Sequence, residues 1–147
     1  MTHVSRSRIV PFTCQQMYDL VNDVERYAEF LPFFSKSEVH HRDSNIVQAT
    51  LTITAAGISK SFTTRNQLQT NKMIEIHLIN GPFNHLEGFW RFDTTDTGCL
   101  IAFDLEFDLT KGILSMMIGP IFEQIANKMV DAFCERANAL YALELPC

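Results

Sequence analysis

The middle of the chain alternates between apolar and polar residues over several consecutive segments. From Ile46 to Ala55, apolar Val, Ala, Leu and Ile occupy every second position, and Thr or Gln occupies the positions between. A period of two is typical of a strand with one buried and one solvated face. Further strands are predicted, in chain order, at 4–10, 35–42, 58–68, 73–79, 86–93 and 99–108. The first of them has an alternation broken by Arg6 and Arg8, and the second is weak, with only Val39 clearly apolar. Because the turns between most of them are short, we expect an antiparallel sheet of about six to seven strands.

Helical spacing occurs at two places. After the first strand, Thr13 and Gln16 have the spacing of a capping box, and two short helices are predicted before Pro32. Near the end, apolar residues recur every three or four positions from Pro120 to Leu143, which predicts a helix about 36 Å long. Pro120 suits a first helical position, so the apolar run at 113–118 is expected to precede the helix, as a simple connection or as a gate. The order of elements predicts one α+β domain, residues 1–147, with a bent sheet around the last helix.

The apolar faces of the strands and of the last helix either pack as a solid core or enclose a pocket. Thr64 and Asn66, with Lys60, fall at inward positions of their strand, and buried polar groups need hydrogen-bond partners. A few convergent polar groups on an apolar wall are typical of ligand sites. The residues predicted to line such a pocket are Leu51, Ile53, Phe62, Thr64, Asn66, Ile76, Leu78, Trp90, Phe92, Phe103, Leu105, Phe122, Ile125, Met129 and Phe133.

Three segments expected outside long regular elements are also apolar, which is unusual for loops. They lie around Phe33, around Pro82 and between Leu114 and Pro120. If they meet at one end of the sheet, they form an apolar rim around the pocket. The predicted rim residues are Tyr27, Leu31, Pro32, Phe33, Pro82, Phe83, His85, Leu114 and Met117.

Composition narrows the classes of function. The 147 residues carry a net charge of −5, which disfavours nucleic-acid binding driven by positive charge, and no direct DNA contact is expected. The 12 Phe residues indicate either a bulky core or an enclosed apolar ligand. No apolar run is long enough to span a bilayer, and no secretory signal begins the chain. Four scattered cysteines are expected to be free thiols, and no metal-ligand spacing occurs. We therefore expect a cytoplasmic protein that is at most peripheral to the inner membrane.

Four blocks of sequence, taken in order, resemble the START-like (helix-grip) family. They run from Tyr27 to Pro32, from Lys60 to Asn66, from Gly81 to Phe92 and from Phe133 to Ala137. This family includes coenzyme-Q-binding proteins and bacterial ribosome-association toxins. The resemblance implies a hydrophobic cavity between the sheet and the last helix.

The first function that the resemblance implies is binding of ubiquinone or a related isoprenoid quinone, as a ligand and not as a redox cofactor. The protein would act as a carrier or chaperone supporting respiration, in transient contact with the membrane surface. Asn66, Thr64 or Lys60 would orient the quinone head group.

The alternative is a toxin that binds the large ribosomal subunit and blocks 70S formation. Acidic residues Asp104, Glu106 and Asp108 on the last strand disfavour contact of that face with RNA. The basic residues gather on the first two predicted strands, either as a solvated face or as a contact surface: Arg6, Arg8, Lys36, His40, His41 and Arg42.

A third function is a polyketide-cyclase-like enzyme, with Tyr27 or His85 as acid or base. The chain has none of the common nucleophile, phosphate-binding or metalloprotease motifs. We therefore predict no catalytic residue, no cofactor and no metal.

Overall fold

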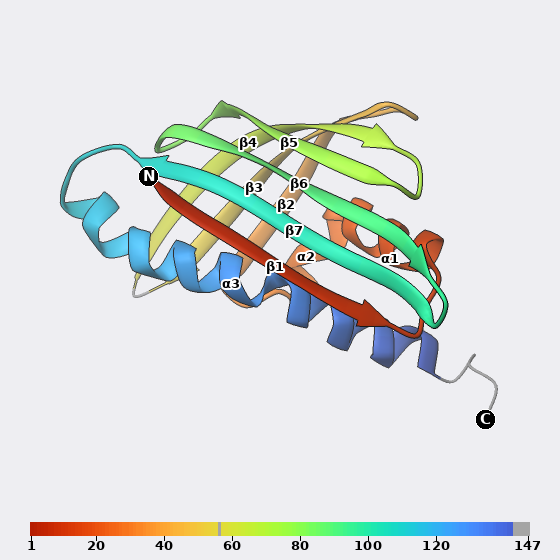
Figure 1. Ribbon diagram of the computed structural model, residues 1–147. Coiled ribbons are helices and arrows are strands. Elements are labelled where there is room, and N and C mark those ends of the chain that lie inside the picture. The colour runs from red at the N-terminus through yellow and green to blue at the C-terminus, as the bar shows by residue number, and fades with distance from the viewer. Residues whose placement is uncertain (56, 143–147) are drawn as a thin grey trace.

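The computed structural model describes residues 1–55 and 57–142 (Figure 1). In chain order the elements are β1 (Thr2–Val10), α1 (Cys14–Asn22), the 3-10 helix η1 (Val24–Arg26), α2 (Tyr27–Phe30), β2 (Phe34–Arg42), β3 (Ile46–Ala55), β4 (Ile58–Gln69), β5 (Met73–Asn80), β6 (Phe83–Thr95), β7 (Gly98–Leu109) and α3 (Ile113–Tyr141).

The strands form one seven-stranded antiparallel sheet in the order β1-β7-β6-β5-β4-β3-β2. Consecutive strands from β2 to β7 are neighbours, whereas β1 pairs with β7 at the far edge. The segment α1–η1–α2 therefore carries the chain from one edge of the sheet to the other, and α3 lies across the same face (Figure 1). This arrangement confirms the predicted α+β helix-grip fold.

The alternation of the strands separates a core face from an outer face. On β3, Val47, Ala49, Leu51 and Ile53 are buried. The threonines between them point outward and join neighbouring strands through hydroxyl pairs, with 2.7–2.8 Å between the oxygens of Thr50 and Thr63, Thr52 and Ser61, and Thr54 and Ser59. Such cross-strand pairs hold the register of a sheet on its solvated side.

The predicted start of α1 is confirmed. The backbone N–H of Gln16 donates to the Thr13 hydroxyl at 3.0 Å, and the N–H of Thr13 donates to the Gln16 side-chain oxygen at 2.9 Å. This capping box satisfies two amide groups that have no partner inside the helix.

The predicted start of the last helix is wrong. It begins at Ile113, and Pro120 lies inside it. The run at 113–118 is therefore the first part of α3, and its helical bonding is already present where the Met116 N–H donates to the Gly112 carbonyl at 3.1 Å. Gly-Pro is a common signal for a helix boundary. Here the helix continues through Pro120 although the proline has no N–H for the carbonyl four residues earlier. The 29 residues make α3 about 44 Å long.

Buried apolar side chains fill the space between the sheet and the helices. They include the cysteines Cys14, Cys99 and Cys134, which are free thiols as predicted, whereas Cys147 lies outside the described residues. Across residues 1–55 and 57–142, no helix is both long enough and apolar enough to cross a membrane.

Candidate functional site

A cavity of about 60 Å³ lies between the core face of the sheet, α3 and the α1–η1–α2 segment. Eleven residues predicted as pocket lining surround it: Leu51, Phe62, Thr64, Asn66, Ile76, Trp90, Phe103, Leu105, Phe122, Ile125 and Met129. Tyr27, predicted at the rim, also lines it. Residues from the helical segments near both ends of the chain and from the six strands β2–β7 therefore meet at one place.

The walls are mostly apolar. Within the described part of the chain, the lining residues whose side chains carry oxygen or nitrogen are Tyr27, Thr64, Asn66 and Trp90. Thr64 and Asn66 are only 4% and 8% exposed, although both are polar. They lie two positions apart on β4, so their side chains leave the same face of the strand.

Asn66 has an incomplete set of hydrogen bonds. Its Oδ1 atom is buried and has no hydrogen-bond partner among the residues that the structure describes. Its strand neighbours on either side, Val47 and Ile76, are apolar and offer nothing to bind it. A buried acceptor without a donor is costly, which makes this amide the most informative polar group of the cavity.

The Tyr27 hydroxyl already has a hydrogen-bond partner within the protein. It donates to the Val21 carbonyl, which ties α2 to α1. Burial raises the pKa of Tyr27 far above its usual value, so the phenol stays protonated at neutral pH. This hydroxyl therefore acts as a structural donor, and it does not fit the predicted role of an acid or base.

Trp90 belongs to an aromatic cluster that forms part of the cavity wall. It stacks on Phe103 at 4.2 Å between ring centroids and meets Phe133 edge-on at 5.2 Å. The indole is 1% exposed. The cluster joins β6, β7 and α3 through ring contacts of favourable geometry.

Five residues predicted to contact a ligand do not line this cavity. Phe133 is fully buried behind the cavity, against the rings of Tyr27, Phe30 and Trp90. Phe92 packs against Tyr18 of α1 instead. The other three, Ile53, Leu78 and the half-buried Lys60, share the core-facing parity of their strands but do not reach the cavity. Strand parity identifies the face of the sheet from which a side chain projects. It does not show whether that side chain lies next to the cavity.

Sequence reasoning also missed six lining residues: Val21, Val24, Phe34, Ile74, Leu86 and Ala126. Ile74 and Leu86 have the same parity as the predicted Ile76 and Trp90, so the alternation itself carried a signal for them. Val21 and Val24 belong to the helical segment after β1, and their place at the cavity depends on how that segment crosses the sheet.

The residues predicted at the rim differ in their exposure. Leu31 and Phe83 are buried, and Phe83 packs against Phe62, Phe107 and Phe122. Phe33 and Met117 are 40% and 47% exposed.

The remaining rim residues lie in different environments. Pro32 is exposed, Pro82 is half-buried, and the side chain of Leu114 lies outside the described part of the structure. His85 is half-buried, and its Nε2 lies 3.6 Å from a Glu106 carboxylate oxygen and 4.0 Å from one of Glu87, on the outer face of the sheet. It is therefore not placed to act on a ligand in the cavity.

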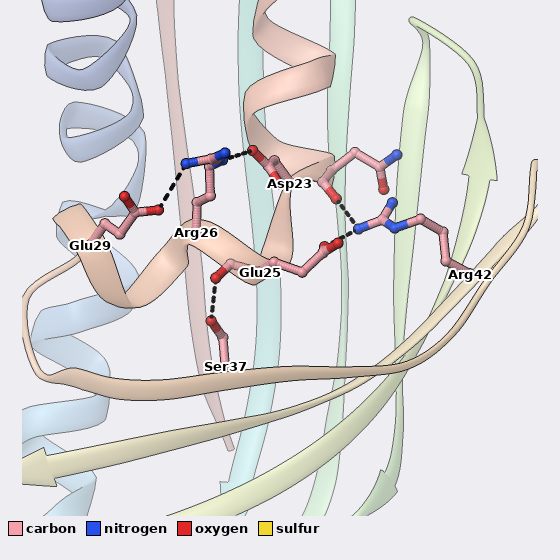
Figure 2. A network of polar contacts seen from close by, with 7 residues as sticks. Asp23, Glu25, Arg26, Glu29, Ser37 and Arg42 are labelled. Carbon is pink, nitrogen blue, oxygen red and sulfur yellow. Dashed lines mark hydrogen bonds and ion pairs between the residues drawn. The ribbon is translucent and has the colours of Figure 1, made fainter.

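Polar contacts at the surface hold the α1–η1–α2 wall against β2 (Figure 2). Arg42 of β2 donates to the Asn22 carbonyl at 3.0 Å and pairs with Glu25, and Ser37 donates to the Glu25 carbonyl at 3.1 Å. Arg26 pairs with Asp23 and Glu29 within the helical segment. These contacts position Val24 and Tyr27 at the cavity.

The predicted gathering of basic residues is wrong, because β1 and β2 are the opposite edges of the sheet. Arg6 and Arg8 of β1 bind Asn127 and Asp131 of α3 at 2.8 and 3.4 Å. On β2, Lys36 pairs with Glu38. The other basic side chains of β2 bond elsewhere, His40 with Thr50, His41 with Asp43, and Arg42 with Glu25.

Cation binding has no support in the described residues. Within residues 1–55 and 57–142, no three His, Cys, Asp or Glu side chains are grouped as metal ligands. The polar groups of the cavity are an amide, two hydroxyls and an indole, all neutral at pH 7. They are suited to hold a ligand by hydrogen bonds inside an apolar wall.

Known proteins match the chain over nearly its full length. The family described as "Polyketide cyclase / dehydrase and lipid transport" matches residues 10–134. A Pseudomonas aeruginosa protein named ribosome association toxin RatA is 45% identical over 141 residues, 95% of this chain and 98% of that protein. A Xenopus laevis protein named coenzyme Q-binding protein COQ10 homolog B, mitochondrial, is 27% identical over 93% of this chain and 58% of that protein.

The same fold occurs in a solved START superfamily protein from Mycobacterium smegmatis. It superposes with a TM-score of 0.77 at 19% identity, over 94% of this chain and 98% of that one. Together with the matched sequence family, this places the chain in the START-like polyketide cyclase/dehydrase and lipid transport family.

Proposed function

We propose that this protein binds a hydrophobic ligand with a small polar group in the cavity between β4, β6, β7 and α3, and carries or protects it without changing it chemically. The observation that carries this proposal is the buried Asn66 amide in an otherwise largely apolar cavity. An isoprenoid quinone is the favoured ligand, and the likeness to a protein named for coenzyme Q binding supports it.

The cavity must widen to take such a ligand. Its volume is about 60 Å³, whereas a cavity of about 150 Å³ is the size that holds benzene. The wall made by α1, η1 and α2 is the one held by surface polar contacts (Figure 2), and exposed ion pairs contribute about 1 kcal/mol or less each. We propose that the cavity widens by outward movement of this wall, which would also separate the rings of Tyr27 and Phe133.

Mass spectrometry of an organic extract of the purified protein tests the proposal. Ala126 is 1% exposed and lines the cavity, so Ala126→Leu fills the space that a ligand would enter. Ala132→Leu, on the same helix but not at the cavity, is the matched control. We expect a near-stoichiometric isoprenoid quinone in the wild type and in Ala132→Leu, and its loss in Ala126→Leu. A folded wild-type protein that is empty and takes up no added quinone contradicts the proposal.

Delivery of a quinone requires contact with a membrane surface. Met116 and Met117 are 78% and 47% exposed near the start of α3 and provide an apolar contact there. Flotation with phospholipid vesicles is the test. Replacement of both residues by Gln is expected to reduce the floated fraction, and an unchanged fraction contradicts this contact.

Association with the ribosome is the second candidate function. It is favoured by the 45% identical, full-length relative named as a ribosome association toxin. On this candidate the protein binds the large subunit and blocks its joining with the small one. Sucrose gradients after expression in the native host are expected to show fewer joined ribosomes and more free subunits, and an unchanged profile counts against it. The Ala126→Leu variant shows whether this effect needs an open cavity.

A further inference from the structure

The Asn66 side chain constrains the chemistry of the ligand. Its Oδ1 atom is an acceptor, buried beside the cavity and without a donor among the described residues. Restoring a hydrogen bond to such an atom recovers the cost of its burial, whereas a second acceptor placed against it does not.

Oxidised and reduced quinones differ in this respect. The ring oxygens of a quinone are carbonyls, which only accept hydrogen bonds, whereas those of the reduced quinol are hydroxyls, which donate and accept. We propose that the polar group of the ligand is a hydroxyl that donates to Asn66 Oδ1, so that the cavity prefers the quinol, or another phenol-like compound, over the quinone. This inference rests on the proposed binding function and adds the redox form of the ligand.

The other polar groups of the cavity also allow binding of a hydroxyl group of the ligand. The Thr64 hydroxyl lies on the same face of β4 as Asn66 and can donate to a lone pair of the ligand oxygen. The Tyr27 hydroxyl gives its hydrogen to the Val21 carbonyl and so is not available as a donor to a quinone carbonyl. A ligand hydroxyl would therefore supply the donor that Asn66 Oδ1 lacks, whereas a carbonyl would leave this atom without one.

Water is the alternative partner of Asn66. A volume of about 60 Å³ corresponds to about two water molecules. An ordered water there would need several polar partners, and Thr64 and Asn66 are the main ones that the walls provide. If water alone satisfied Asn66, the affinities of the two redox forms would not depend on this residue.

Anaerobic titration with one short-chain ubiquinone, in its oxidised and reduced forms, tests the preference. Trp90 is the only tryptophan of the chain and lines the cavity, so its fluorescence reports occupancy, with calorimetry as a second readout. The quinol is expected to bind about tenfold more tightly than the quinone, a difference of about 1.4 kcal/mol. The dimethyl ether of the quinol, which has no donor, is expected to bind no better than the quinone.

The Asn66→Leu variant removes the amide at similar volume. We expect it to weaken quinol binding about tenfold and to leave quinone binding within about twofold. Because it also removes a buried acceptor without a partner, the ligand-free variant is expected to unfold at a higher urea concentration than the wild type. Gln67→Ala, on the exposed face of the same strand, is the matched control.

The possible results distinguish failure of the redox preference from failure of the proposed binding function. Equal affinity for both redox forms, or an equal loss of both in Asn66→Leu, overturns the preference for a hydroxyl and leaves the binding function standing. A lower stability of ligand-free Asn66→Leu overturns it as well, because the amide would then be bonded within the protein. Failure of the wild type to bind either form overturns the proposed function itself.

Discussion

At the scale of single residues, Gly88 shows how closely the wall behind the cavity is packed. It lies between Ile76 of β5 and Leu105 of β7, both of which line the cavity. A Cβ atom at this position would lie 2.3 Å from the carbonyl oxygen of Asp104. The obstacle is backbone and cannot rotate away.

Gly88→Ala is therefore expected to lower the free energy of unfolding by about 3 kcal/mol. Urea denaturation followed by circular dichroism measures it. A loss below about 0.5 kcal/mol, the usual range for a surface substitution, would show that the strands separate easily here.

Asp43 provides a pH-dependent contact in the turn between β2 and β3. The ring of His41 binds its carboxylate at 2.8 Å, and the N–H groups of Asn45 and Ile46 donate to it at 2.7 and 2.8 Å. These bonds, the one from His41 first, lower the pKa of Asp43 to about 2. In an unfolded chain the pKa is about 3.9.

Because the folded-state pKa is the lower one, the contribution of Asp43 to stability is complete above about pH 4 and is lost as the pH falls towards 2. Carboxyl-carbon NMR titration is expected to show Asp43 still ionised at pH 3. A midpoint near 4 would mean that the turn is not formed in solution.

At the scale of elements, surface polar contacts and buried ring contacts together attach the α1–η1–α2 segment to its neighbours. Arg42 is its main polar link to β2. Arg42→Met keeps the aliphatic part of the side chain and removes the donors. We expect a loss of stability of about 1 kcal/mol or less, with faster hydrogen exchange at the Arg26 and Leu31 amides, which bond to Asp23 and Tyr27 within the segment.

Arg65→Met, at an exposed position of β4, is the control for loss of a positive charge. Exchange at the Arg26 and Leu31 amides that is unchanged in Arg42→Met would exclude Arg42 as the contact holding this wall closed.

At the scale of the whole molecule, the aromatic cluster couples parts of the chain that are far apart. Trp90 of β6 contacts Phe103 of β7 and Phe133 of α3, and Phe133 contacts Tyr27 of α2. We therefore predict that residues 1–147 unfold as one domain. Trp90 fluorescence and far-ultraviolet circular dichroism are expected to give the same urea midpoint. A separate, earlier loss of helical signal would show that α3 detaches on its own.

Much of this protein was predictable from short-range patterns. Strands such as β3 and β7 follow from a period of two, the start of α1 from the spacing of Thr13 and Gln16, and the inward direction of Thr64 and Asn66 from parity alone. These features depend on residues a few positions apart in one element, whose relative directions are set by the local backbone geometry. The family resemblance depends likewise on blocks of neighbouring residues kept in order.

Tertiary structure decided the rest, because it joins residues whose separation no local pattern records. Pairing of β1 with β7 places Arg6 and Arg42 at opposite edges of the sheet, although both lie on the first two strands of the chain. The crossing of α1–η1–α2 and α3 over the sheet selects which inward residues border the cavity, so that Val24 lines it and Phe92 does not. The same crossing leaves the Asn66 oxygen beside the cavity without a donor among the described residues, and this acceptor defines the ligand chemistry we propose.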